Sequence, residues 1–174
     1  SGHAGAEQMH LGDTRLSFTA LTQSVKRTGA KVSLIVVDAC RSGGLTRVKG
    51  GVPAQPFEIR TDNKLDSSGL AIIASSAAGE DAQESDKLRG GIFTHHLVMG
   101  LSGAADASGD QTVTLSELYR YTYAQTIRTT SRTRFVQHPT YSFKIKGRQE
   151  VVLSRLASAR GLGRLVLGAR GAYI

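Results

Sequence analysis

The sequence contains one cysteine, Cys40, in a setting that suits a reactive thiol. It follows an apolar run at residues 32–37 and precedes the turn-forming sequence Ser42-Gly43-Gly44. Glycines let the backbone bend sharply, so that amide groups can point at the thiol. A free cysteine is also among the residue types most often buried in a core. The position is therefore compatible with a nucleophile and with an inert core cysteine.

A histidine flanked by small residues, His3, precedes Cys40 by 37 positions. A cysteine and a histidine that are distant in sequence but adjacent in the fold form a nucleophile and its base. The imidazole would accept the thiol proton and later protonate the leaving amine. A second histidine, His10, lies in residues 3–12, which we expect to form a loop, and we assign it no role unless it lies close to Cys40.

The run VSLIVV before the cysteine lacks polar alternation, which is typical of a central strand buried on both faces of a parallel sheet. Catalytic groups gather outside the carboxyl ends of such strands, where Asp38, Cys40 and Arg41 lie. Asp38 and Cys40 are two residues apart and should face one side. A carboxylate there would disfavour the thiolate unless a cation neutralises it. That cation could be a substrate Arg or Lys, or an internal base such as Arg41.

Hydrophobic periodicity and capping signals predict the remaining elements of an α/β fold. Ser17 can cap a first helix that Gly29 ends. The expected elements are a helix at 16–28, strands at 32–37 and 70–75, helices at 93–101 and 115–128, and a strand at 139–145.

These motifs resemble a known family. SGHA at residues 1–4, followed by a buried strand ending in DACRSG, resembles the catalytic core of caspase-like cysteine peptidases. The Asp-x-Cys ending is more similar to metacaspases and bacterial caspase-like proteins than to animal caspases. LAIIASS, GGIFTHHLVMGL and HPTYSFKI follow in the same order.

The resemblance covers residues 1–147 and implies a caspase/haemoglobinase fold, a three-layer α/β sandwich with a mostly parallel central sheet. It also implies that strands which normally precede the histidine are missing here, so we expect the chain to be a piece of a longer protein and to contact the remaining segments of that parent protein. Residues 148–174 would begin an accessory, β-rich segment.

The resemblance also implies roles for individual residues. His3 and Cys40 would form the catalytic dyad, and the backbone amides of Ala4 and Cys40 would bind the oxyanion. Ala4 stands where family members usually have glycine. Animal caspases carry glutamine at the place of Asp38 and bind aspartate, so Asp38 implies cleavage of proteins or peptides after Arg or Lys.

A long stretch at 45–68 is rich in Gly, Pro and mixed charge, and a loop of this length is usually functional or disordered. In the resembling family this region joins the two catalytic segments and is often cut. The candidate self-cleavage points are Arg47, Lys49, Arg60 and Lys64. The alternative is a linker that is never processed. A second polar stretch at 76–91 would line the cleft with its acids, or be an exposed solvated loop.

Residues 106–117 place oxygen-bearing side chains at positions 1, 3, 5, 9 and 12, as in an EF-hand calcium loop. The sixth position holds Gln111 where the sharp turn calls for glycine. Thr114 and Glu117 also form a capping box, so these residues can serve only to start a helix. No cofactor or metal is required for the proposed chemistry, and calcium remains an option.

Composition limits the remaining classes. The 174 residues carry a net charge of +8, and nine Lys or Arg against one acid fall in residues 131–174. Without a nucleic-acid motif or interleaved aromatics, we expect a solvated face or a domain contact rather than nucleic acid. No apolar run is long enough to span a membrane. The single cysteine is compatible with a reducing cytoplasm.

Three functions remain open from the sequence. The first is a cysteine endopeptidase. The second is a catalytically silent caspase-like scaffold that binds partners, and the third is a calcium-responsive regulatory module.

Overall fold

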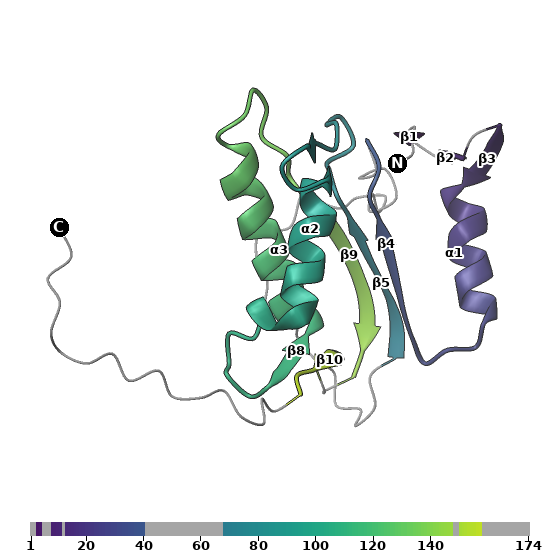
Figure 1. The fold of residues 1–174 in the computed structure, drawn as a ribbon. Helices are drawn as coiled ribbons and strands as arrows, with labels where there is room; N and C mark the ends of the chain where they lie inside the picture. The colour runs from purple at the N-terminus through teal and green to yellow at the C-terminus, as the bar shows by residue number, and fades with distance from the viewer. Residues whose placement is uncertain (1–2, 5–7, 12, 41–67, 148–149, 158–174) are drawn as a thin grey trace, which may run out of the picture.

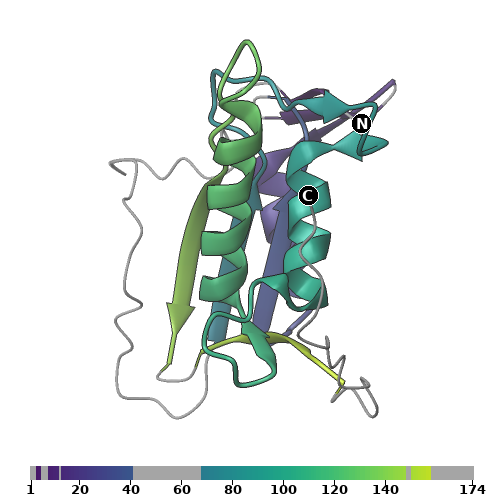
Figure 2. The same ribbon diagram turned by 60° about the vertical axis from the view of Figure 1, so that its left-hand side comes forward.

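The computed structural model describes residues 3–4, 8–11, 13–40, 68–147 and 150–157. These residues form three layers (Figures 1 and 2), with a central sheet, helix α1 on one face, and helices α2 and α3 on the other. This arrangement confirms the predicted α/β sandwich.

The central sheet has the strand order β4-β5-β9. Strand β4 (Val32–Val37) runs parallel to β5 (Ser68–Ala74), and β9 (Thr140–Lys146) pairs with the other side of β5 in antiparallel fashion. All three strands confirm elements expected from the sequence.

The prediction that the strand before Cys40 is central is wrong for the described residues. Strand β5 occupies the centre, and β4 lies at an edge. Leu34 and Val36 of β4 are accordingly 37% and 39% exposed. The apolar run is typical of a strand covered on both faces, but the described residues cover only the face of β4 that carries Ile35 and Val37.

Helix α1 (Phe18–Arg27) begins two residues later than the predicted range 16–28, since residues 16 and 17 belong to β3. The predicted cap is confirmed, because the side chain of Ser17 accepts a 3.1 Å hydrogen bond from the Ala20 amide. The helix packs on one face of the sheet through Phe18. Gly29, with φ of +71°, redirects the chain after the helix into β4. This layer's core consists of Phe18, Ile35, Val37, Ala39, Leu70 and Ile72.

The opposite face is covered by α2 (Ile92–Met99), which continues into a π-helical turn η2 (Gly100–Ala104), and by α3 (Leu115–Thr130). Thr114 and Glu117 form the predicted capping box at the start of α3. The buried core on this face consists of Ala71, Ile73, Phe93, Leu97, Ala105, Val113, Leu115, Leu118 and Tyr119.

Residues near the N-terminus are not the loop that the sequence predicted. They form a small antiparallel sheet of β1 (His3–Ala4), β2 (Gln8–Leu11) and β3 (Thr14–Ser17). Met9 pairs with Leu16 across two of its strands and packs against the core beneath α1. This burial gives the short strands a stability that their sequence alone does not signal.

A second small pairing lies within the stretch expected to be a polar loop. Strands β6 (Glu84–Ser85) and β7 (Gly90–Gly91) form a hairpin that leads directly into α2. Both this hairpin and the sheet containing β1 lie at the end of the central sheet where β4 and β5 terminate (Figure 1).

The segment after residue 147 contains the expected strand, β10 (Val152–Arg155), which pairs with β8 (Thr112–Thr114). However, Val151, Leu153 and Leu156 pack against the core formed by α2 and α3. Residues 151–156 thus pack with the core of the preceding segment, and the domain division at residue 147 stays a prediction. Residues 158–174, the rest of the expected accessory segment, lie outside the described part.

Among the described residues, no helix combines the length and hydrophobicity that a membrane span requires.

Candidate active site

Cys40 and Asp38 lie just beyond the carboxyl end of β4, separated by Ala39. Ala39 is buried against the α1 layer, whereas Asp38 and Cys40 are both partly exposed. Strand β4 ends at Val37, and Ala39 lies in a bend between the two partly exposed residues. The carboxylate and the thiol are therefore both accessible at one edge of the sheet.

The peptide unit before Cys40 is held by two buried serines at the end of the neighbouring strand. The Ala39 amide donates to Ser75 Oγ (3.2 Å), and Ser76 Oγ donates to the Ala39 carbonyl (3.3 Å). The Ser75 amide in turn donates to the Val37 carbonyl (2.9 Å). These bonds restrict the backbone that carries the thiol.

The thiol contacts the loop that follows β5. Cys40 Sγ lies 3.9 Å from the carbonyl oxygen of Ala82. A stretch predicted from its position after β5 to line the cleft therefore does lie against the cysteine.

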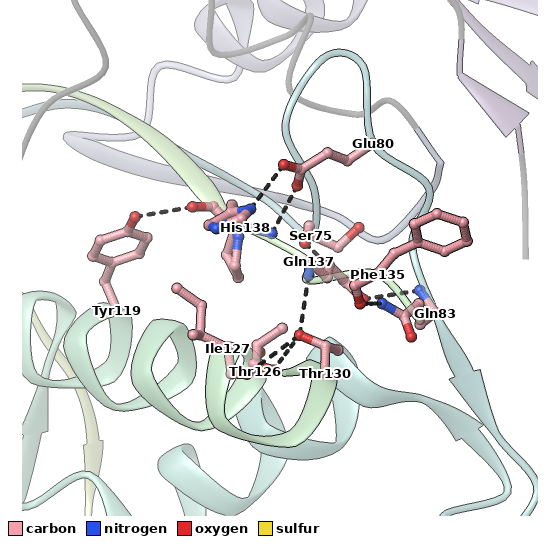
Figure 3. A network of polar contacts seen from close by, with 11 residues as sticks. Ser75, Glu80, Gln83, Tyr119, Thr126, Ile127, Thr130, Phe135, Gln137 and His138 are labelled. Atoms are coloured by element: carbon pink, nitrogen blue, oxygen red, sulfur yellow. Dashed lines mark hydrogen bonds and ion pairs between the residues drawn. The ribbon is translucent and has the colours of Figure 1, made fainter. Parts of the chain in front are cut away.

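This loop is fastened by a buried amide that the sequence did not single out (Figure 3). Gln137 has an exposed fraction of 0%, and its Nε2 donates to the Ser75 carbonyl (2.7 Å) while its Oε1 accepts from the Gln83 amide (2.8 Å). The backbone amide of Gln137 donates to Thr130 Oγ1 at the end of α3 (3.0 Å). One side chain thus joins the end of β5, the loop at the thiol and the segment before β9.

A second attachment uses His138 and Glu80 (Figure 3). The His138 amide lies 2.8 Å from one carboxylate oxygen of Glu80, and His138 Nδ1 lies 2.8 Å from the other. Gln83 Nε2 also donates to the Phe135 carbonyl (2.6 Å). The loop beside Cys40 is therefore tied to residues 135–138 at three places.

Of the acids expected to line the cleft, Glu80 thus binds His138. This pair holds the loop against the segment before β9. The sequence provided no signal for it, because the partners are 58 residues apart.

Asp38 accepts a hydrogen bond from the hydroxyl of Thr94 in the first turn of α2. No ion pair links Asp38 to a Lys or Arg anywhere in the part of the chain that is described. Arg41, the internal cation considered from the sequence, falls in the undescribed residues 41–67.

His3 and Ala4 form β1, and their backbone register places His3 opposite His10 and Ala4 opposite Met9. Strand β1 lies at the same end of the sheet as the terminus of β4 (Figure 1). The pairing of His3 with Cys40, and the use of the Ala4 and Cys40 amides as oxyanion donors, stay predictions. Arg47, Lys49, Arg60 and Lys64 lie outside the described residues.

The loop compared with a calcium site directs its carboxylates at its own backbone. Asp106 accepts from the amides of Gly109 (2.8 Å) and Gln111 (3.0 Å), and Glu117 accepts from the amides of Ser108 (3.1 Å) and Thr114 (3.0 Å). Asp110 accepts from the amide and hydroxyl of Thr112, which lower its pKa.

Gln111 makes the turn at the sixth position with φ of +65°, despite not being glycine. Within the described ranges, no three His, Cys, Asp or Glu side chains are placed to hold a metal ion. The loop is thus held by its own hydrogen bonds, and calcium binding there stays a prediction.

Comparison with known proteins bears on the whole arrangement. The caspase domain family matches residues 2–148, which span most of the 174-residue chain. A search of curated proteins finds no match. The matched range includes the cysteine, both serines that hold its backbone, and the loop that contacts its thiol. The chain therefore belongs to the caspase domain family of cysteine peptidases.

Proposed function

We propose that this chain is the catalytic part of a cysteine endopeptidase of the metacaspase and bacterial caspase-like type, which cleaves proteins after Arg or Lys. One observation carries the proposal: Cys40 and Asp38 are both partly exposed beyond the end of β4, on either side of the buried Ala39. A nucleophile and an anionic anchor are thereby offered to the same substrate.

The chemistry assigns Cys40 as nucleophile and His3 as base. The thiolate attacks the carbonyl carbon of the scissile bond, and the amides of Ala4 and Cys40 stabilise the oxyanion. The C–N bond then breaks, and His3 gives its proton to the leaving amine. Water attacks the thioester and releases the carboxylic acid, which restores the free thiol.

Asp38 is the proposed anchor for the basic side chain of the substrate. Guanidinium groups match carboxylates in shape and charge, so an Arg side chain can neutralise Asp38 while its backbone lies at the cysteine. The absence of an ion pair at Asp38 among the described residues supports this role.

Among the described residues β4 pairs only with β5, which supports the expectation that remaining segments of the parent protein contact this chain. Its unpaired edge offers backbone groups to a further strand, and the exposed Leu34 and Val36 offer apolar surface to a further segment. We therefore direct the experiments at the full-length protein that contains this chain.

The test compares two fluorogenic peptides, one with Arg and one with Asp before the cleaved bond. The enzymes are the parent protein and its Cys40→Ala and Asp38→Asn forms, all checked for folding by circular dichroism. We expect cleavage after Arg, its loss in Cys40→Ala, and a decrease in kcat/KM on the order of tenfold or more in Asp38→Asn.

Cleavage after Asp would contradict the assignment of Asp38 while keeping the peptidase activity. If the folded protein cleaves neither peptide, a catalytically silent scaffold becomes the better interpretation. Rapid alkylation of Cys40 at neutral pH, relative to a free thiol, would support the enzyme independently of substrate choice.

A further inference from the structure

We propose that Thr94 and Gly91, at the start of α2, position the carboxylate of Asp38 and thereby determine the preference for a basic side chain. The inference rests on the proposed function, since it concerns how the same site recognises its substrate. Thr94 and Gly91 act through Asp38 and are positioning residues.

The first observation is the contact between Thr94 and Asp38. Thr94 Oγ1 donates to Asp38 Oδ2, and the bond connects the end of β4 with the first turn of a helix 56 residues later in the chain. Within the described ranges, Oδ1 of the same carboxylate has no hydrogen-bond partner. Among these residues one oxygen is held by Thr94, and the proposal assigns Oδ1 to the basic side chain of the substrate.

The second observation is the space at Gly91, which directly precedes α2. A Cβ atom added to Gly91 would lie 2.5 Å from Asp38 Oδ2 and 3.4 Å from its Cγ. The first distance is too short for any real contact, so a larger residue would displace the carboxylate. The φ of Gly91 is −62°, which every residue adopts readily. The site therefore needs glycine for room and not for its backbone conformation.

The start of α2 is itself firmly placed relative to the cysteine. The Ile92 amide donates to the Gln83 carbonyl (2.9 Å), and Gln83 follows Ala82, whose carbonyl contacts the thiol. Asp38 is thus set by a helix end that is connected, through one loop, to the nucleophile.

This arrangement has a physical consequence for recognition. Pairing of Oδ1 with a guanidinium requires the carboxylate to keep one orientation, and a side chain already held there loses less freedom on binding. An Asp38 released from Thr94 would still carry its charge but would sample several orientations. Loss of the hydrogen bond from Thr94 should therefore weaken binding of the substrate Arg more than it slows the chemical step.

The test uses Thr94→Val, which removes the hydroxyl at nearly constant shape, and Thr94→Ser, which keeps the hydroxyl. Each enzyme is assayed with a peptide carrying Arg before the cleaved bond and with one carrying citrulline, the uncharged analogue. We expect Thr94→Val to raise KM for the Arg peptide about tenfold with kcat nearly unchanged, and to reduce the discrimination between Arg and citrulline. Thr94→Ser should restore both values.

Gly91→Ala provides a second, independent variant and should reduce the same discrimination. Thermal unfolding of each variant, and the alkylation rate of Cys40, identify any change that comes from the fold or from the thiol. A purely structural role of Thr94 would not raise KM while leaving kcat nearly unchanged, with both values restored by Thr94→Ser.

The outcomes separate this inference from the proposed function. If Asp38→Asn loses Arg cleavage while Thr94→Val and Gly91→Ala keep the parent's kinetics, the positioning role is wrong and the proposed function stands. If the parent protein does not distinguish Arg from citrulline, the basic specificity itself fails and the inference fails with it.

Discussion

The side-chain amide of Gln137 donates a 2.7 Å hydrogen bond to the carbonyl of Ser75, and the two residues are 62 positions apart. Ser75 also holds the amide of Ala39, the residue before the cysteine. A continuous set of hydrogen bonds therefore runs from the segment before β9 to the backbone that carries the thiol.

Replacing Gln137 by leucine should impair both stability and activity. The variant removes the hydrogen bonds that Gln137 makes to the Ser75 carbonyl and the Gln83 amide, which costs about 1–3 kcal/mol of unfolding free energy. We also expect kcat to fall, because the Ala82 carbonyl and the Cys40 backbone lose a common support. Urea unfolding and peptide hydrolysis measure the two effects. An unchanged unfolding free energy would show that Gln137 does not stabilise the fold by linking Ser75 and Gln83.

Glu80→Gln should loosen the loop beside Cys40 without greatly destabilising the protein. His138 is 45% exposed at its side chain and Glu80 is 31% exposed, so the pair contributes less than about 1 kcal/mol. Hydrogen–deuterium exchange should nevertheless accelerate at the amides of residues 77–83. Glu84→Gln, an exposed acid in the same stretch, is the matched control. Equal exchange in both variants would contradict the role of the Glu80–His138 pair.

Glu117 should stabilise the fold in a pH-dependent manner. Burial raises its pKa, but hydrogen bonds from Thr114 and Ser108 outweigh burial and hold the pKa below its ordinary value. A carboxylate whose pKa is lowered by folding stabilises the protein above its unfolded pKa of about 4.3, and this contribution is lost as the pH falls through the folded pKa.

Glu117→Gln should therefore reduce the unfolding free energy by about 1 kcal/mol at neutral pH, with a smaller difference in acid. Urea unfolding at neutral pH and below pH 4 provides the measurement. Asp13→Asn, which changes an exposed acid, controls for net charge. The capping role would be wrong if the loss caused by Glu117→Gln were the same at both pH values.

Calcium should leave the melting temperature unchanged. The carboxylates of Asp106, Asp110 and Glu117 accept hydrogen bonds from the loop itself, so the conformation of the loop is supported by its own side chains. The measurement is thermal unfolding in the presence of calcium and of a chelator. An increase of several degrees with calcium would contradict this expectation and revive the regulatory alternative.

Much of the local structure followed from the sequence, because it depends on contacts between near neighbours. The Ser17 cap, the Thr114–Glu117 capping box and the apolar strands β4 and β5 were all predictable from short patterns. The motifs around His3 and Cys40 were also sufficient to indicate the family.

Only the tertiary structure decided how distant segments meet. The partly buried Met9 of the β1–β2–β3 sheet packs against the core of the α1 layer, and the edge position of β4 depends on which described strands pair with it. Thr94 and Gln137 carry no local signal at all, since their partners lie 56 and 62 residues away. The sequence alone determined which residues could do chemistry, whereas chain topology selected the polar side chains that hold them in place.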